Sequence, residues 1–407
     1  MKNDDGPLAG LRVIDHTSVV VGPVSTRILG DYGADVIKVE SPNGDLLRSM
    51  ADGGRNAKMS PKFMNFNSNK QSICLNLKSP KGRKILKKLL KDADIYVSNV
   101  RPASLKKLGL DYRSIKKINP MLIYCSIVGF GSKGRYSNRP AYDPIIQSLS
   151  GIAATNERAT KKPRFVPMVI TDHITGLIAS QAIGFALYRR EKTNIGEFIE
   201  VPMFENMAAF TLAEHMGGEL FHPPTGPTGD LRQLTDSYRP FETSDGYMTV
   251  TPNTDEQTIA FFNAIGREDL INDERFQNAY SRTVHNEEYA KIREKELKKK
   301  SSEDWLNIFQ EADVPCARYN SLEDLFQDPH LNDVNFFKIQ DHPSEGKIKT
   351  FKPANKFSGG NNISYKHAPK LGENTLEILE RLGIPSDEIK YLIESKIAFS
   401  CKSINGT

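Results

Sequence analysis

Residues 11–40 read LRVIDHTSVVVGPVSTRILGDYGADVIKVE, and this stretch decides the expected fold. Its first five residues, with apolar Leu11, Val13 and Ile14, predict a short buried strand, and the pair Gly22-Pro23 opens a helical stretch that continues through Leu29. The apolar run 36–39, which follows Gly33, predicts a second strand. A strand, a helix and a strand in this order form a βαβ unit, from which parallel sheets are built.

The same alternation continues along the first half of the chain. Pro80 begins a segment whose apolar residues share one helical face, and residues 94–98 and 121–127 are expected to be strands. These patterns predict an α/β protein with a doubly wound, mostly parallel sheet, whose ligands lie beyond the carboxyl ends of the strands. A site is therefore expected near four segments: 15–23, 40–48, 98–102 and 128–143.

The pattern changes after Arg190. The proline-rich loop 223–229 indicates a domain boundary. We expect strands at 198–201 and 246–251, helices at 203–216 and 375–382, and one charged helical stretch at 286–312. The basic run 298–300 is interpreted as a solvated helix face, because acidic residues interleave it and no aromatic stacking platform accompanies it.

Composition limits the class of protein. The chain has 407 residues, enough for two or three domains, and its net charge of +5 is too small and too dispersed to favour an obligate nucleic-acid binder. The four cysteines are far apart, so a disulfide scaffold and a zinc site are not expected. The N-terminus lacks an apolar signal segment, and the longest apolar stretch, 177–188, is too short for a membrane span. We therefore expect a soluble, cytoplasmic protein.

Two local motifs suggest chemistry that the surrounding sequence does not support. Glu40 ends the second strand, where dinucleotide-binding proteins keep a ribose-binding acid, but no G-x-G-x-x-G precedes it. The pair Asp172-His173 resembles part of a hydrolase triad, but no G-x-S-x-G precedes it.

Asp172 itself has two interpretations. It lies between the apolar residues Val169-Ile170 and a helical run from Gly176, so its carboxylate is expected at or near a helix N-terminus. The helix macrodipole lowers the pKa of a carboxyl group at that position. Local sequence favours a plain N-cap role, but an ionised carboxylate on a loop above a sheet could also be a nucleophile. Basic and amide side chains follow the strand ends and would suit a phosphate-bearing ligand, although each alone is more typical of a solvated surface: Lys78, Asn99, Arg101 and Lys107.

Several segments, taken together and in this order, resemble the class III CoA-transferases. This group contains the formyl-CoA:oxalate and carnitine CoA-transferases and the related α-methylacyl-CoA racemases. The resemblance covers nearly the whole chain. The matching segments are 8–15, Gly22-Pro23, 33–40, Gly44-Asp45 with Arg48, Asn69-Lys70 before Ile73, 99–102, 109–112, 141–143, Asp172 with Thr175-Gly176, and 371–373.

The resemblance implies a fold and a domain organisation. It implies a Rossmann-like large domain with a mostly parallel sheet, a smaller α+β domain, and an interlocked homodimer. Combined with the boundary above, it predicts the N-terminal part of the large domain at 1–220, a linker at 221–235, the small domain at 236–330, and a linker and C-terminal segment returning to the large domain at 331–407.

The resemblance also implies an activity and a site. The activity is the transfer of CoA from an acyl-CoA to a free carboxylic acid, through an aspartyl anhydride and thioester. CoA is then a substrate, and no permanently bound cofactor or metal is implied. Asp172 matches the family's nucleophile, which replaces the N-cap interpretation. The implied CoA-binding residues are Val20, Leu75, Asn76, Lys78, Asn99, Val100, Arg101, Lys107, Tyr142 and Asp143.

The chain departs from two branches of this group. It has Ser18 and Val20 where the oxalate enzymes have His and Gln, so oxalate is not implied as the acid. It has Tyr142 where the racemases have a histidine base, so two-base proton exchange lacks one base. A racemase or epimerase of the same fold remains one alternative, and a non-catalytic CoA-binding protein is another.

Overall fold

The structure is a computed structural model that describes residues 6–50, 53–359 and 365–401. By their internal contacts the residues fall into two compact units, each described here by itself. Unit 1 comprises residues 1–150, 166–209 and 336–407, and unit 2 comprises residues 151–165 and 210–335. The expected boundaries assigned 151–165 and 210–220 to the large domain, 221–235 to a linker and 331–335 to the C-terminal segment, whereas by internal contacts all four segments belong to unit 2. Periodicity reveals elements but not which elements pack together.

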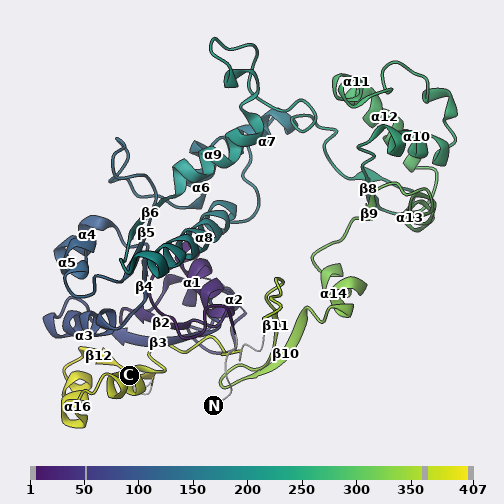
Figure 1. The fold of residues 1–407 in the computed structure, drawn as a ribbon. Coiled ribbons are helices and arrows are strands. Elements are labelled where there is room, and N and C mark those ends of the chain that lie inside the picture. Colours follow the sequence, from purple (N-terminus) through teal and green to yellow (C-terminus); the bar gives the residue numbers. More distant parts are fainter. Residues whose placement is uncertain (1–5, 51–52, 360–364, 402–407) are drawn as a thin grey trace. The chain divides into compact units, whose positions relative to one another are not determined.

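Unit 1 is built on a seven-stranded sheet of strand order β12-β3-β2-β1-β4-β5-β6 (Figure 1). All its neighbouring strands are parallel except β12 and β3, which are antiparallel, so the predicted mostly parallel sheet is confirmed. β12 is close to the C-terminus, and the C-terminal segment therefore forms one edge of the sheet. The strands are β1 (Arg12–His16), β2 (Asp35–Glu40), β3 (Lys70–Leu75), β4 (Ile95–Ser98), β5 (Ile123–Val128), β6 (Phe198–Pro202) and β12 (Ala398–Phe399), and a separate hairpin joins β10 (Phe337–His342) to β11 (Gly346–Phe351).

Helices cover both faces of this sheet. Ile14 of β1 belongs to a core cluster shared with α3 (Pro80–Lys91), α4 (Pro102–Leu108), α15 (Thr375–Arg381) and α16 (Ser386–Glu394). Its neighbour Asp15 points to the other face and accepts a hydrogen bond from Thr26 of α1 (Val21–Asp31). Three helices of unit 1, namely α2 (Pro61–Asn67), α3 and α4, start with a proline, which fits the first helical turn, and the predicted start at Pro80 is confirmed. The helices of unit 1 are α1 (Val21–Asp31), α2 (Pro61–Asn67), α3 (Pro80–Lys91), α4 (Pro102–Leu108), α5 (Tyr112–Lys116), α6 (Asp143–Leu149), α8 (Ile170–Thr193), the first half of α9 (Met203–His215), α15 (Thr375–Arg381) and α16 (Ser386–Glu394), with a short 3₁₀ turn at Leu46–Arg48.

Unit 2 has a three-stranded antiparallel sheet and its own apolar core. Trp305 and Phe309 stack in this core, with ring centroids 5.2 Å apart. Its strands are β7 (Phe241–Glu242), β8 (Tyr247–Val250) and β9 (Cys316–Arg318), and its helices are α7 (Ile152–Thr160), α10 (Asp255–Ala264), α11 (Ala279–Val284), α12 (Asn286–Leu297), α13 (Ser302–Glu311) and α14 (Pro329–Asp333), with 3₁₀ turns at Gly217–Leu220, Glu268–Leu270 and Asp324–Phe326.

The single helical stretch predicted at 286–312 is wrong, because two helices lie there. Ser301 caps α13 by accepting a hydrogen bond from the backbone N–H of Asp304, and this cap starts a new helix. The basic run 298–300 lies at the turn between the two helices, and Lys298 pairs with Glu242.

Neither a membrane-spanning helix nor a metal-binding cluster is present among the described residues. No helix among them is long and apolar enough to cross a membrane, and they contain no group of three or more His, Cys, Asp or Glu side chains that could hold a metal ion. The expected cytoplasmic location stays a prediction.

Candidate active site

Unit 1 has a cavity of about 820 Å³ at the carboxyl ends of β1, β4 and β5. These strands are neighbours in the order β1-β4-β5, and the step from β1 to β4 is where the chain order of the sheet reverses. Open α/β sheets bind their ligands at this point. The cavity is lined by Ser18, Val19, Val20, Val21, Asn99, residues 101–104, Lys107, residues 127–129, residues 137–142, Asp172 and Met203.

The cavity contains some of the residues predicted from the sequence and not others. The six that line it are Val20, Asn99, Arg101, Lys107, Tyr142 and Asp172. Those that do not line it are Leu75, Asn76, Lys78, Val100 and Asp143. The Leu75 side chain is fully buried in the core of the sheet, and Val100 packs against the same core. Contacts of these five residues with CoA stay a prediction.

Positive charge dominates the cavity wall. Arg101, Lys107 and Arg139 line it and are exposed, and Asp172 is the one acidic residue among its described lining residues. Such a wall favours an anionic ligand. Arg139, which lies over the ring of Tyr136 at 4.2 Å, was not predicted, because its loop carries no motif that distinguishes it from other surface loops.

The loop after β1 is held by two side chains from elsewhere in unit 1. The Asn99 amide accepts from the backbone N–H of Ser18 at 3.0 Å and donates to the carbonyl of Ser18 at 2.8 Å. Asp45 accepts from the backbone N–H of Val19 at 3.0 Å. Val19 has a φ of 67°, which is strained for a β-branched residue and persists only where surrounding contacts impose it. Asn99 therefore shapes the cavity by positioning this loop.

Buried ion pairs also stabilise the loop after β1. Lys38 Nζ lies 2.9 Å from Asp45 Oδ2 and donates to the carbonyl of Thr17 at 2.9 Å. Lys70 Nζ lies 2.9 Å from Asp15 Oδ2. Burial alone would raise the pKa of Asp15, but the ammonium groups of Lys70 and Lys38 outweigh it and hold that pKa well below its usual range.

Glu40 belongs to a similar buried pair. Its carboxylate accepts from Arg48 Nε and Nη2, both at 2.8 Å, and from Ser72 Oγ at 2.7 Å. Burial would raise the pKa of Glu40, but Arg48 lowers it to about 2. A carboxylate used in this way is not free to bind a ribose, which agrees with the absence of the glycine fingerprint.

Asp172 is the third residue of α8, and Val169 is the N-cap of that helix. The N-cap interpretation of Asp172 from local sequence was therefore wrong. Gly176, one turn later, permits a close approach of α8 to α1, since a Cβ there would lie only 2.8 Å from the carbonyl oxygen of Val21. This approach places the first turn of α8 beside the loop after β1.

Asp143 performs the capping function that local sequence suggested for Asp172. Its Oδ1 accepts from the backbone N–H of Thr171 at 2.8 Å, from Thr171 Oγ1 at 2.7 Å and from the backbone N–H of Asp172 at 3.2 Å. Gln147 donates to Asp143 Oδ2 at 2.7 Å and to the carbonyl of Met168 at 3.1 Å. Asp143 and Gln147 thus hold the start of α8, and no motif in the sequence indicates the role of Gln147 or Thr171.

The pKa of Asp172 is raised to about 7. The main cause is burial, the second is the negative charge of Asp143, and Lys62 opposes both. The expected lowering by the helix macrodipole was therefore wrong, because desolvation and a second carboxylate outweigh it. Perturbed carboxyl groups inside a cavity are typical of catalytic sites.

Comparisons with known proteins fit this geometry. The model of CoA-transferase family III matches residues 8–375. The chain belongs to this family. The family III match confirms the resemblance derived from the sequence, and the chain is a CoA-transferase.

Three relatives show the extent of the similarity. The succinyl-CoA:glutarate CoA-transferase of Mus musculus is 32% identical over 92% of this chain and 86% of its own length. The acetyl-CoA:oxalate CoA-transferase of Acetobacter aceti is 35% identical over 77% of this chain and 80% of its own length. The crystal structure of a CAIB/BAIF family protein from Brucella suis has a TM-score of 0.78 at 30% identity, covering 93% of this chain and 99% of that one.

Proposed function

We propose that this CoA-transferase moves CoA from an acyl-CoA to a small mono- or dicarboxylic acid, with Asp172 as its covalent nucleophile. The observation that carries the proposal is the position of this single acidic side chain in a cavity whose other charged residues are Arg101, Lys107 and Arg139. The relatives named for glutarate and oxalate support a small diacid as the first acceptor to test.

The reaction can proceed through two kinds of aspartyl intermediate. An Asp172 oxygen attacks the thioester carbonyl, the C–S bond breaks, and a mixed anhydride and CoA thiolate result. The thiolate attacks the aspartyl carbonyl and releases the donor acid, which leaves an aspartyl-CoA thioester. The acceptor carboxylate then attacks the aspartyl carbonyl of this thioester, which releases the CoA thiolate and forms a second mixed anhydride. The thiolate attacks the acceptor's acyl carbonyl in that anhydride, which forms the new acyl-CoA and frees Asp172. Each step exchanges one activated acyl group for another, so no ATP is consumed.

The surrounding residues support these steps in different ways. Arg101 and Lys107 suit the phosphates of CoA, and binding at this remote end positions the thioester. Asp143 is a positioning residue, since it holds the turn of α8 that carries Asp172. We propose Arg101 and Lys107 as the residues that hold CoA.

We also propose an interlocked homodimer, as the resemblance implies. Helix α8 exposes large apolar side chains at a spacing that puts them on one face: Leu177 is 57% exposed, Phe185 67% and Tyr188 65%. Interlocked chains separate only by unfolding, so a monomer at nanomolar concentration in mass photometry would contradict the proposal.

A substrate panel tests the activity. Succinyl-, acetyl- and formyl-CoA are each mixed with small mono- and dicarboxylates, and a new acyl-CoA is expected without ATP for at least one pair. Turnover with no pair would favour a non-catalytic CoA-binding protein. Solvent deuterium entering the α-carbon of an acyl-CoA without transfer would favour a racemase.

Arg101→Ala should weaken CoA binding. A lost charge-assisted contact costs about 1 to 3 kcal/mol, which is roughly a 5- to 150-fold loss of affinity. Arg113→Ala is the matched control, since Arg113 is also exposed but does not line the cavity. Calorimetry that gives equal affinities for the two variants would remove Arg101 from the site.

The transfer rate should rise with pH through the pKa of Asp172. Below about pH 7 this carboxyl is protonated and cannot attack, so kcat/KM should fall about tenfold per pH unit on the acid side. Asp143→Asn removes a negative charge that raises the pKa of Asp172, so the acid side of the kcat/KM profile should move to lower pH. A kcat/KM profile that stays flat from pH 5 to pH 8 would contradict the role of Asp172 as the nucleophile. So would an acid side of the profile that moves to higher pH in Asp143→Asn.

A further inference from the structure

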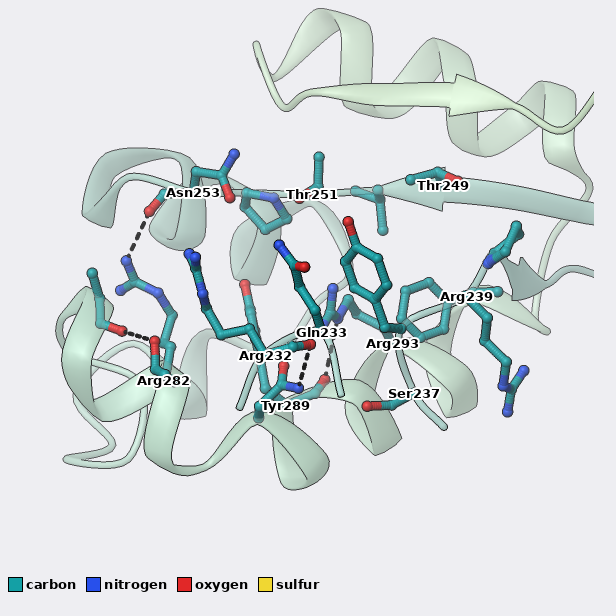
Figure 2. Close-up of a pocket in the computed structure, with 18 residues that line it drawn as sticks. Arg232, Gln233, Ser237, Arg239, Thr249, Thr251, Asn253, Arg282, Tyr289 and Arg293 are labelled. Atoms are coloured by element: carbon teal, nitrogen blue, oxygen red, sulfur yellow. Dashed lines mark hydrogen bonds between the residues drawn. The ribbon is translucent and has the colours of Figure 1, made fainter. Parts of the chain in front are cut away.

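Unit 2 contains a second cavity, of about 570 Å³, that the proposed reaction does not use (Figure 2). We call it the arginine pocket, because every charged residue among its described lining residues is an arginine. These are Arg232, Arg239, Arg282 and Arg293. They come from the segment before β7 and from α11 and α12, so only the fold of unit 2 brings them together.

Three of the four arginines have carboxylate partners that lie outside the lining of the pocket. These ion pairs are Arg232 with Asp230 at 2.8 Å, Arg239 with Glu294 at 2.5 Å and Arg282 with Asp255 at 2.8 Å. The carboxylates therefore orient the guanidinium groups, and no acidic side chain on the wall opposes the approach of an anion.

Arg293 differs from the other three. In the part of the chain that the structure describes, no carboxylate lies within ion-pair distance of it. Its guanidinium carbon lies 4.7 Å from the ring centroid of Phe241 and 4.5 Å from that of Tyr289. The two rings hold the cation in place. Burial lowers the pKa of Arg293, and the charges of Tyr289 and Glu294 oppose this shift.

The rest of the wall combines apolar surface with hydrogen-bonding groups. Tyr238, Pro240 and Val250 provide apolar area, and the amides of Gln233 and Asn286 also line the pocket. The Gln233 amide donates to Glu214 and the Asn286 amide donates to the carbonyl of Arg232. Most of the lining residues are polar or charged, so the pocket suits a polar small molecule with a limited apolar surface.

We propose that the arginine pocket binds a small molecule that carries an oxyanion, a carboxylate or a phosphate, on a planar or apolar body. Arg293 pairs with the oxyanion, Arg232 lies on the same wall, and the aromatic rings contact the body. The pocket shares no described lining residue with the cavity of Asp172, and the transfer steps proposed above do not use it.

Calorimetry on the full-length protein tests this site with two probes that share a planar body. Phenyl phosphate carries a phosphate and 3-phenylpropionate carries a carboxylate, so the tighter probe identifies the source of the oxyanion. Arg293→Gln should weaken binding of that probe about tenfold or more, the effect of one lost charge-assisted contact. Arg275→Gln, at an exposed arginine that pairs with Asp273 outside the pocket, should leave it unchanged.

Two further variants keep the test decisive. The Arg232 side chain is largely exposed, so we expect Arg232→Gln to fold and to weaken binding of the probe, even if Arg293→Gln does not fold. Arg101→Ala changes only the other cavity and should retain binding of the probe. Absence of binding by wild type at millimolar probe, or a loss in Arg101→Ala with no loss in Arg232→Gln, would overturn the proposal.

Discussion

Asp172→Asn should abolish CoA transfer while CoA binding is retained. An amide is nearly isosteric with the carboxyl group but cannot form the acyl anhydride, so we expect the rate to fall by a factor on the order of 10⁴ or more. The nucleotide end of CoA is proposed to bind Arg101 and Lys107, which the substitution does not touch. Steady-state transfer and calorimetric CoA affinity, measured on the same preparation, test both parts.

The stability of the same variant provides its control. The pKa of Asp172 is about 7 in the folded protein and near 3.8 when unfolded, so ionising Asp172 destabilises the folded state as pH rises between these values. Asn carries no charge, and the variant should therefore be more stable than wild type at pH 8, by up to about 4 kcal/mol, and similar to it at pH 4. A fully active Asn variant, or one that is less stable than wild type at pH 8, would contradict this account.

Asp45→Ala should destabilise the protein by about 3 to 5 kcal/mol, the usual cost of breaking a buried ion pair. Asp45 and Lys38 have fully buried side chains, so the substitution leaves the Lys38 charge without its nearest partner. It also removes the acceptor for the backbone N–H of Val19, which holds the strained loop of the cavity. CoA affinity should therefore fall together with the free energy of unfolding.

Asp35→Ala is the matched control for this prediction. Asp35 also pairs with a cation, Arg12, but at 3.4 Å and with both side chains partly exposed. Such pairs contribute less than about 1 kcal/mol. Equal shifts of the urea midpoint in the two variants would show that burial of the Asp45 pair does not determine its contribution.

The sheet could be predicted because its signals are local. The run 11–15, the Gly22-Pro23 pair and the run 36–39 specify strand, helix and strand within a short segment, and β1, α1 and β2 lie there. Pro80 likewise marks the start of α3. The division into units could not be predicted in the same way, because α7 has helical periodicity in either unit and only its packing assigns it.

The site shows the limits of local sequence more clearly. Asp172 and Asp143 are 29 positions apart, and local pattern placed a capping carboxylate at Asp172 because the true cap comes from another helix. The sign of the pKa shift at Asp172 was missed for the same reason, since burial and the neighbouring carboxylate arise only in the folded chain. The arginine pocket also gives no sequence signal, because its arginines are spread from 232 to 293.

The most direct test of the central claim is trapping of the aspartyl intermediate. The wild-type enzyme is incubated with an acyl-CoA that it turns over, then treated with hydroxylamine, digested and analysed by mass spectrometry. We expect a hydroxamate on the peptide that contains Asp172, absent when the acyl-CoA is omitted. A hydroxamate at another acid, such as Asp143, or no hydroxamate during active turnover, would contradict nucleophilic catalysis by Asp172.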